Sequence, residues 1–286
     1  MQRHDFVIMP CKKGNFMAQN ILSTATSKLP RKWFTEKIYD NLQPFGEFII
    51  FTTRFFKEIF NLPFEGIEFI RQTFFIGNRS FGLVITTGFI MGMVLTLQSR
   101  PTLEEFGAES WLPQMVAISI IREIGPVITA LICAGKVGSG IGAELGSMKV
   151  SEQIDAMEVS GSNPCKYLVV TRVLASAIML PILVLCADLT GLIGSFLAAN
   201  IEGDISFQLF IGRALGSVEF SDFIPATIKS IVFGFFIGMI GCYKGFNANR
   251  GTESVGKASN EAVIAASLMV FVIDVIAVQF TTLIIS

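Results

Sequence analysis

Five apolar runs, each long enough to cross a lipid bilayer, constrain this chain more than any other feature of its sequence. A spanning helix needs about 20 apolar residues, because each residue adds about 1.5 Å and the hydrocarbon core is about 30 Å thick. Inside that core the backbone polar groups must bond within the segment, which favours helices. The sequence therefore predicts an all-α polytopic membrane protein, with spans at residues 81–99, 111–135, 166–194, 225–245 and 262–284.

The composition agrees with this class and excludes several functions. Charged residues make up 16% of the 286 residues, against about 25% in soluble domains, so neither a soluble enzyme nor a disordered chain fits. The net charge of −1 gives no reason to expect a nucleic-acid partner. His4 is the only histidine and the five cysteines form no CxxC pair, so we expect no metal site and no catalytic residues.

An amphipathic segment at residues 45–78 precedes the first predicted span. On a helical wheel of residues 47–60, most apolar side chains fall in one half, opposite four charged side chains, namely Glu47, Arg54, Lys57 and Glu58. The segment is therefore predicted to lie in the membrane interface, and its four charges argue against a sixth span. Pro63 and Gly66 are expected to break the helix before a second short piece. Residues 1–44 are expected to form a cytoplasmic extension, and residues 79–286 the five-span domain.

The distribution of lysine and arginine predicts the orientation. Five spans place the two termini on opposite sides of the membrane. The N-terminal side carries 18 Lys and Arg residues, counted with its two loops and their flanks, which include Arg172. The opposite loops, 100–110 and 195–222, are short and acidic, include Asp222, and carry only Arg100 and Arg213. By the positive-inside rule, the N-terminus is predicted to be cytoplasmic and the C-terminus periplasmic.

Five ionisable residues lie inside the predicted spans, where a charge is costly and is a functional candidate by default. They are Arg122, Glu123, Asp188, Lys229 and Asp274. Arg122 and Glu123 point about 100° apart on a helix, so at least one needs a partner on another helix. One interpretation is a cavity for the headgroup of an amphipathic substrate, formed by Arg122, Glu123 and Lys229. The other is structural ion pairing, such as Arg122 with Asp188 or Asp274.

The loop between the second and third spans carries a second pattern. Residues 144–158 are predicted to form one helix with an acidic face and an apolar stripe, which suits docking into a partner's groove or, equally, a solvated loop helix. The residues proposed for docking are Glu144, Lys149, Glu152, Gln153 and Asp155. Gly135 and Lys136 are followed by valine, so no phosphate-binding Walker A motif is present, and any ATP must be bound by another chain.

Four stretches resemble the MlaE family, the permease subunits of MCE-associated ABC-type lipid transporters. They are IREIGPV (121–127), AGKVGSGIGAELGSMKVSEQIDAMEVSGSNP (134–164), IKSIVFG (228–234) and the GTESVGKAS loop (251–259), followed by the span that contains Asp274. The resemblance implies a homodimer in the inner membrane of a double-membrane bacterium. It also implies a separate cytoplasmic ATPase that binds ATP and Mg²⁺, a periplasmic MCE-domain partner, and phospholipid as substrate.

The resemblance also assigns roles to particular segments. It maps the family's charged cavity onto Arg122, Glu123 and Lys229, and the coupling helix that seats in the ATPase onto residues 144–158. Arg122 and Lys229 would meet the lipid phosphate, and Met91, Leu95 and Ile118 could line an acyl path. The expected dimer seam consists of the first, second and fifth spans. The chain would then be a non-catalytic permease subunit without a cofactor of its own.

A proton-coupled secondary carrier is the alternative. Its relay would use Glu123, Asp188 and Asp274. Such carriers usually contain internal repeats, and the five unequal spans show no convincing repeat. The carrier would also leave the acidic helix of the loop without a use.

Overall fold

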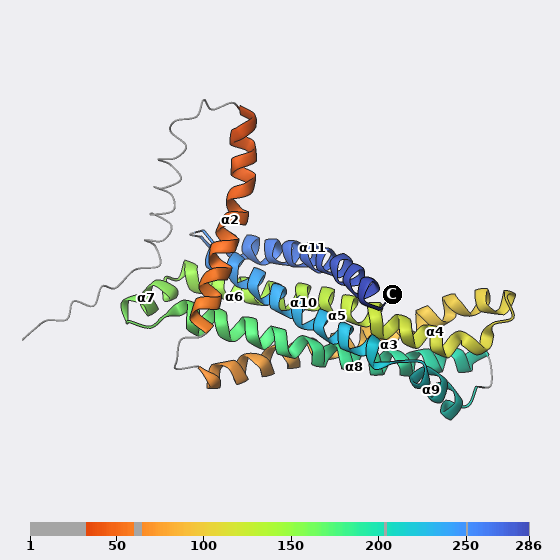
Figure 1. The fold of residues 1–286 in the computed structure, drawn as a ribbon. Coiled ribbons are helices and arrows are strands. Elements are labelled where there is room, and N and C mark those ends of the chain that lie inside the picture. The colour runs from red at the N-terminus through yellow and green to blue at the C-terminus, as the bar shows by residue number, and fades with distance from the viewer. Residues whose placement is uncertain (1–32, 60–64, 203–204, 250, 286) are drawn as a thin grey trace, which may run out of the picture.

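The computed structural model describes residues 33–59, 65–202, 205–249 and 251–285, and helices are the only regular elements in these ranges (Figure 1). The helices are α2 (Trp33–Ile59), α3 (Gly66–Glu105), η1 (Glu109–Trp111), α4 (Leu112–Ser119), η2 (Ile120–Ile124), α5 (Gly125–Cys133), η3 (Ala134–Gly138), α6 (Ser139–Val150), α7 (Gln153–Val159), η4 (Cys165–Val170), α8 (Thr171–Glu202), α9 (Phe207–Gly216), α10 (Phe220–Phe246) and α11 (Thr252–Ile285).

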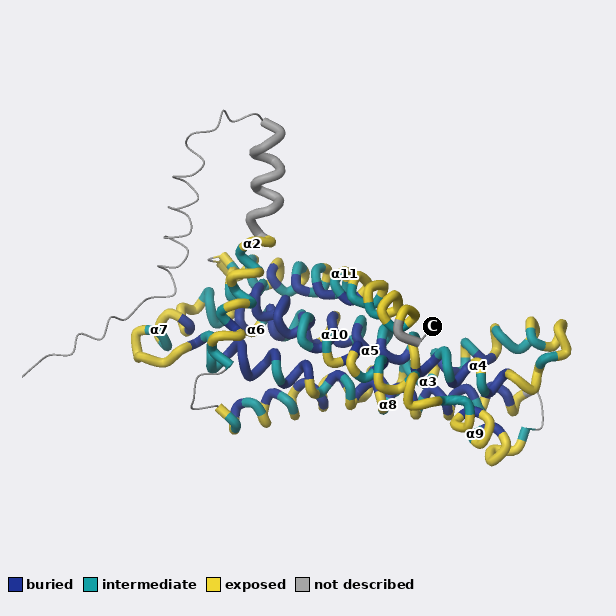
Figure 2. Tube along the Cα trace, viewed as in Figure 1, coloured by how far each residue is buried: buried dark blue, intermediate teal, exposed yellow. Residues whose placement is uncertain are grey.

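The predicted fold class is confirmed: five helices are long and apolar enough to cross a membrane, and one helix precedes them. The second of the five is a continuous rod, Glu109–Val150, built from η1 to α6. The five form an elongated bundle, with α7 at one end and α9 at the other (Figure 1). Helices α8 and α10 bury many of their residues, whereas α11 exposes much of its length at one edge (Figure 2).

Helix α3 begins well before the expected start of the first span at residue 81. The second short piece that we expected before it is the first part of this helix. Polar residues near its start are bonded: Gln72 Nε2 donates to Glu68 Oε1 at 2.8 Å, and the Tyr167 hydroxyl donates to Glu68 Oε2 at 3.4 Å. Because these groups are satisfied, the helix can continue through them. Of the extension expected at residues 1–44, residues 33–44 form the first part of α2, and residues 1–32 lie outside the described residues, as does the break expected at Pro63.

Helix α2 crosses the bundle near the α7 end (Figure 1). Its apolar side packs on α10: the ring of Phe48 lies 5.4 Å from that of Tyr243, and the ring of Phe55 lies 5.6 Å from that of Phe235. Edge-to-face aromatic pairs of this kind are favourable beyond the area they bury. The apolar half that the wheel identified therefore covers the bundle, in part, through phenylalanines at helical spacing.

Helices α3 and α8 approach each other so closely that a side chain does not fit between them. A Cβ atom built on Gly92 would overlap the carbonyl oxygen of Gly191, and one built on Gly194 would overlap that of Phe89. The hydroxyl of Ser195 bridges the two helices, donating to the Gly92 carbonyl at 3.1 Å. Small residues allow this close backbone packing, which stabilises membrane helix pairs.

The segment between the third and fourth spans contains a helix that we did not expect. Helix α9 packs on α4 and forms a second apolar core at the far end of the bundle. Its fully buried members include Phe210 and Ala214 of α9 and Val116 of α4. We interpreted this stretch as a short acidic loop because its charges obscured the apolar spacing of residues 207–216.

The single helix expected over residues 144–158 is two helices. Helix α6 ends at Val150, and α7 begins at Gln153. Between them Glu152 has a φ of 58°, in the left-handed region that a non-glycine residue rarely occupies and that ends a right-handed helix. The turn allows Ile154 to be buried while the rest of α7 remains largely exposed. Because the turn separates α6 from α7, residues 144–158 do not share one helix, and the single acidic face predicted for them does not form.

Candidate functional site

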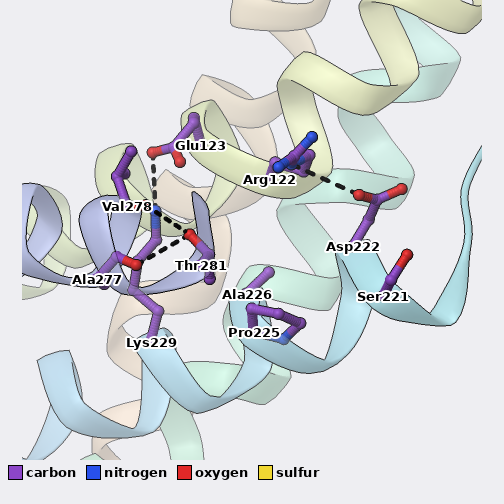
Figure 3. A pocket seen from close by; sticks show the side chains of 10 residues that line it. All are labelled: Arg122, Glu123, Ser221, Asp222, Pro225, Ala226, Lys229, Ala277, Val278 and Thr281. Atoms are coloured by element: carbon purple, nitrogen blue, oxygen red, sulfur yellow. Dashed lines mark hydrogen bonds and ion pairs between the residues drawn. The ribbon is translucent and has the colours of Figure 1, made fainter. Parts of the chain in front are cut away.

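A pocket of about 320 Å³ opens between the second, fourth and fifth spans (Figure 3). Its charged lining comes from two predicted cavity residues of η2, the predicted Lys229 of α10, and Asp222 at the start of α10. The full lining consists of Arg122, Glu123, Ser221, Asp222, Pro225, Ala226, Lys229, Ala277, Val278 and Thr281.

The local backbone of η2 is a π-helical turn. The Gly125 amide donates to the carbonyl of Ile120, five residues earlier. Pro126 follows and has no N–H with which to close an ordinary α-helical bond to the carbonyl of Arg122. Turns of this kind are rare, occur mostly as single-turn bulges and are frequent at functional sites. The sequence signal is therefore the Gly-Pro pair that follows the two charged residues after one isoleucine.

Lys229 lies between two carboxylates. Its Nζ is 2.8 Å from Glu123 Oε2 and 2.7 Å from Asp274 Oδ1. The side chain is only 5% exposed, so Lys229 does not extend to the interface but holds the second, fourth and fifth spans together. Deep burial of a lysine is tolerated when the charge is paired and hydrogen-bonded. We call Glu123, Lys229 and Asp274 the charge triad.

Arg122 points to a different partner from its neighbour Glu123. Its Nε is 3.5 Å from Oδ1 of Asp222, and its side chain remains 43% exposed (Figure 3). Asp222 is held in place by a capping box at the start of α10, in which its Oδ2 accepts the Glu219 amide at 3.2 Å. The two adjacent charges thus contact two positions of one neighbouring helix, as their 100° separation requires.

The structure combines features of both interpretations of the spanning charges. Interhelical ion pairs exist, and three of the predicted residues, Arg122, Glu123 and Lys229, also line one pocket. The suggested pairs of Arg122 with Asp188 or Asp274 are not those observed, since Arg122 contacts Asp222. Asp188 lies against Gly125 instead, and its Oδ1 has no hydrogen-bond partner within the described part of the chain.

The carboxylates proposed for a proton relay do not form one continuous chain. Glu123 and Asp274 are joined through Lys229, whereas Asp188 is absent from the lining of the pocket. Among the described contacts, no hydrogen bond or ion pair connects Asp188 to the charge triad. The geometry therefore favours a single binding pocket over a relay.

The residues proposed for docking divide between two places. Glu144 lies in α6, where its Oε1 is 2.7 Å from Nη2 of Arg172, an arginine that is only 2% exposed. Lys149 Nζ contacts Asp155 Oδ1 at 2.7 Å across the turn between α6 and α7, beside Glu152 and Gln153. Glu144 therefore pairs with a buried arginine although its own side chain is 42% exposed, and the other four residues lie at the end of α6, in the turn and in α7.

Sequence reasoning missed two residues. We assigned Asp222 to an outer loop, although its place three residues after Glu219 fits a capping box. We counted Arg172 among the cytoplasmic flanks, although it lies several residues inside an apolar run and needs a partner such as Glu144. Of the residues suggested for an acyl path, Met91 lines a second, mainly apolar pocket of about 270 Å³, and Leu95 packs against the core at the α9 end.

Comparison with known proteins agrees with the fold. The family model described as Permease MlaE matches residues 69–280, which include most or all of each of the five spans and every residue of the pocket except Thr281. A Rickettsia felis protein named as an ABC transporter permease is 37% identical over 230 residues, 80% of this chain and 89% of the relative.

Two further relatives come from photosynthetic organisms. A Synechocystis protein named as an ABC transporter permease is 33% identical over 203 residues, which cover 71% of this chain and 77% of the relative. The chloroplastic protein TRIGALACTOSYLDIACYLGLYCEROL 1 of Arabidopsis thaliana is 34% identical over 204 residues, covering 71% of this chain and 58% of its own. Because this similarity extends over most of its length and the structure has five candidate spans, the chain belongs to the MlaE family of ABC transporter permeases.

Proposed function

We propose that the chain is the membrane subunit of an ABC-type transporter that moves phospholipid between an inner membrane and a periplasmic MCE-domain partner. A separate ATPase, which carries the ATP and Mg²⁺, drives the movement, and this chain catalyses no reaction itself. The observation that carries the proposal is the pocket of Arg122, Glu123 and Lys229 within the membrane-spanning bundle of an ABC permease. The Arabidopsis relative, which is named after a galactolipid, supports a lipid as the cargo.

The pocket suits the polar part of a lipid because it combines charge with an apolar rim. Ala277 and Val278 of α11 line the pocket on the side of Glu123, away from Arg122 (Figure 3). Helix α11 continues this apolar surface with exposed side chains such as Leu268 and Val275. A lipid could place its headgroup in the pocket while its acyl chains remain against apolar helix surface.

The proposed assembly is a homodimer. Five spans in one chain enclose only a small pocket, so a symmetric partner is needed to complete a lipid-sized cavity. The seam would involve α3, the second span and α11. In this arrangement the α7 end faces the cytoplasm and the ATPase, and the α9 end faces the periplasm and the MCE-domain partner.

The experiment that tests this function is a mild-detergent purification of the tagged chain from its host membrane. Proteins and lipids that remain bound are identified by mass spectrometry. Recovery of an ATPase, an MCE-domain protein and phospholipid together is expected. A chain that emerges alone and without lipid would overturn the proposal and favour the proton-coupled carrier.

Substitution of Arg122 by alanine is expected to lower the amount of bound phospholipid severalfold. The exposed guanidinium is the cation of the pocket that remains open to a phosphate, and hydrogen bonds to charged groups are the stronger ones. The measurement is phospholipid per protein after purification. Arg213→Ala, at an exposed arginine of α9 outside the pocket, is the matched control. Equal lipid in both variants would remove Arg122 from the site.

The double substitution of Glu152 and Asp155 by lysine is expected to reduce recovery of the ATPase while leaving the chain in the membrane. It reverses the charge of the turn and of α7 and breaks the contact between Lys149 and Asp155. The measurement is the ratio of ATPase to permease after purification. Glu105→Lys, at the opposite end of the bundle, is the control. Full recovery of the ATPase by the double variant would exclude this segment from docking.

A further inference from the structure

The charge triad has no positive charge to offer a ligand. Lys229 is enclosed by Glu123 and Asp274 at 2.8 and 2.7 Å, and its side chain is 5% exposed. Two carboxylates against one ammonium leave the ionised triad with a net charge of −1. A phosphate that approached Lys229 would meet the Glu123 carboxylate, whose side chain is 45% exposed. This part of the pocket therefore attracts a cation rather than an anion.

Arg122 provides the opposite half of the site. Only its Nε faces Asp222, at 3.5 Å, which is long for a charge-assisted hydrogen bond. In the described part of the chain, Arg122 donates no side-chain hydrogen bond, and Asp222 is its one ion-pair partner. A guanidinium with its terminal fork free is suited to bidentate contact with a phosphate. The pair of Arg122 and Asp222 adds no net charge, so the whole ionised pocket remains at −1.

The two halves lie side by side because Arg122 and Glu123 are consecutive residues. Figure 3 shows Arg122 turned toward Asp222 and Glu123 turned toward Lys229, with both side chains on the pocket. The rest of the described lining consists of small apolar residues and the hydroxyl residues Ser221 and Thr281. A ligand that matches this arrangement carries a negative and a positive group a few atoms apart.

We propose that this pocket selects zwitterionic aminophospholipids, with the phosphate bound by Arg122 and the primary ammonium bound by Glu123. This proposal rests on the phospholipid function proposed above and names its substrate class. An anionic phospholipid would bring a second negative charge into a pocket that already has an excess of one. The ammonium of an ethanolamine headgroup instead neutralises that excess and donates hydrogen bonds to the exposed carboxylate.

The lining also distinguishes a primary ammonium from a quaternary one. Choline headgroups are recognised by aromatic cages, because a trimethylammonium group donates no N–H hydrogen bond. None of the ten described residues that line this pocket is aromatic. The carboxylate of Glu123 needs a donor, which ethanolamine has and choline lacks. The expected order of preference is phosphatidylethanolamine over phosphatidylcholine and phosphatidylglycerol.

The test is a competition among lipids with identical acyl chains. The full transporter complex is reconstituted in vesicles of equimolar phosphatidylethanolamine, phosphatidylcholine and phosphatidylglycerol. It is extracted again in mild detergent, and the retained lipids are quantified by mass spectrometry. The wild-type complex is expected to retain mainly phosphatidylethanolamine. Retention of phosphatidylglycerol or phosphatidylcholine in equal or greater amount would overturn the selectivity, whereas retention of no phospholipid would overturn the proposed function itself.

Two variants assign the preference to the pocket. Glu123→Gln removes the ammonium acceptor, and the ratio of phosphatidylethanolamine to phosphatidylglycerol is expected to fall roughly tenfold. Asp222→Asn is also expected to lower this ratio. It removes the carboxylate that faces Arg122, so the pocket gains net positive charge and binds the anionic lipid better. Glu105→Gln removes the same charge outside the pocket and is expected to leave the ratio unchanged. A wild-type ratio in both pocket variants would contradict the assignment.

Discussion

Replacement of Lys229 by methionine is expected to destabilise the chain strongly. The substitution keeps the side-chain length but leaves Glu123 and Asp274 without their shared cation. Glu123 is partly exposed and can recover solvent, whereas the Asp274 side chain is only 20% exposed. Removal of one partner from a buried ion pair costs about 3–5 kcal/mol. At about 2–4 °C per kcal/mol for a chain of this size, the thermal midpoint falls by roughly 10 °C.

The measurement is thermal unfolding in detergent, followed by the loss of monodisperse protein on size-exclusion chromatography. The double variant Lys229→Met with Asp274→Asn removes the orphaned buried charge and is expected to recover much of the loss. If the double variant is no more stable than the single one, the cost does not arise from the unpaired carboxylate. If Lys229→Met alone matches the wild type, the charge triad does not stabilise the bundle.

The second large effect is expected for Gly92→Val in α3. A Cβ atom at this position would overlap the backbone carbonyl of Gly191, which cannot move aside as a side chain can. The valine therefore forces α3 and α8 apart and weakens the hydrogen bond from Ser195 to the Gly92 carbonyl. The expected loss of stability is at or above the upper end of the about 1–3 kcal/mol that overpacking usually costs.

Gly82→Val is the matched control for this prediction. It places the same side chain in the same helix, at an exposed position where nothing lies within 4 Å of the added Cβ. Its thermal midpoint is expected to stay near that of the wild type, since glycine is itself unfavourable in a helix. Equal midpoints for the two valine variants would show that the close approach of α3 and α8 contributes little to stability.

Much of the fold could be predicted because each span carries its own signal. A helix in hydrocarbon forms all its backbone hydrogen bonds locally, so a run such as 225–245 indicates a span without knowledge of its neighbours. The ends were harder to place. Helix α3 includes the polar residue Glu68, which is bonded to a distant residue, Tyr167. The break at Glu152 accompanies the burial of Ile154, a contact that no local pattern records.

The residues of the candidate site could be predicted from the sequence, but the ion pairs between them could not. The cost of charge in hydrocarbon is enough to identify Arg122, Glu123 and Lys229 from the sequence. Their partners depend on which helix faces which. Asp222 lies 100 positions from Arg122 along the chain, and Asp274 lies 45 positions from Lys229. Glu144 is a similar case, since only the position of the buried Arg172 shows that Glu144 is its partner.

The membrane class, the five spans, the family and the charged residues of interest can all be predicted from the sequence. They follow from the free energy of transfer into hydrocarbon and from local motifs, which are properties of short segments. The three-dimensional arrangement of the helices was needed to show that two carboxylates pair with Lys229, that Asp222 faces Arg122, and that the pocket has an excess of negative charge. The physical reason is that electrostatic interactions depend on distances between helices, and the packing of small residues such as Gly92 against Gly191 helps to set those distances.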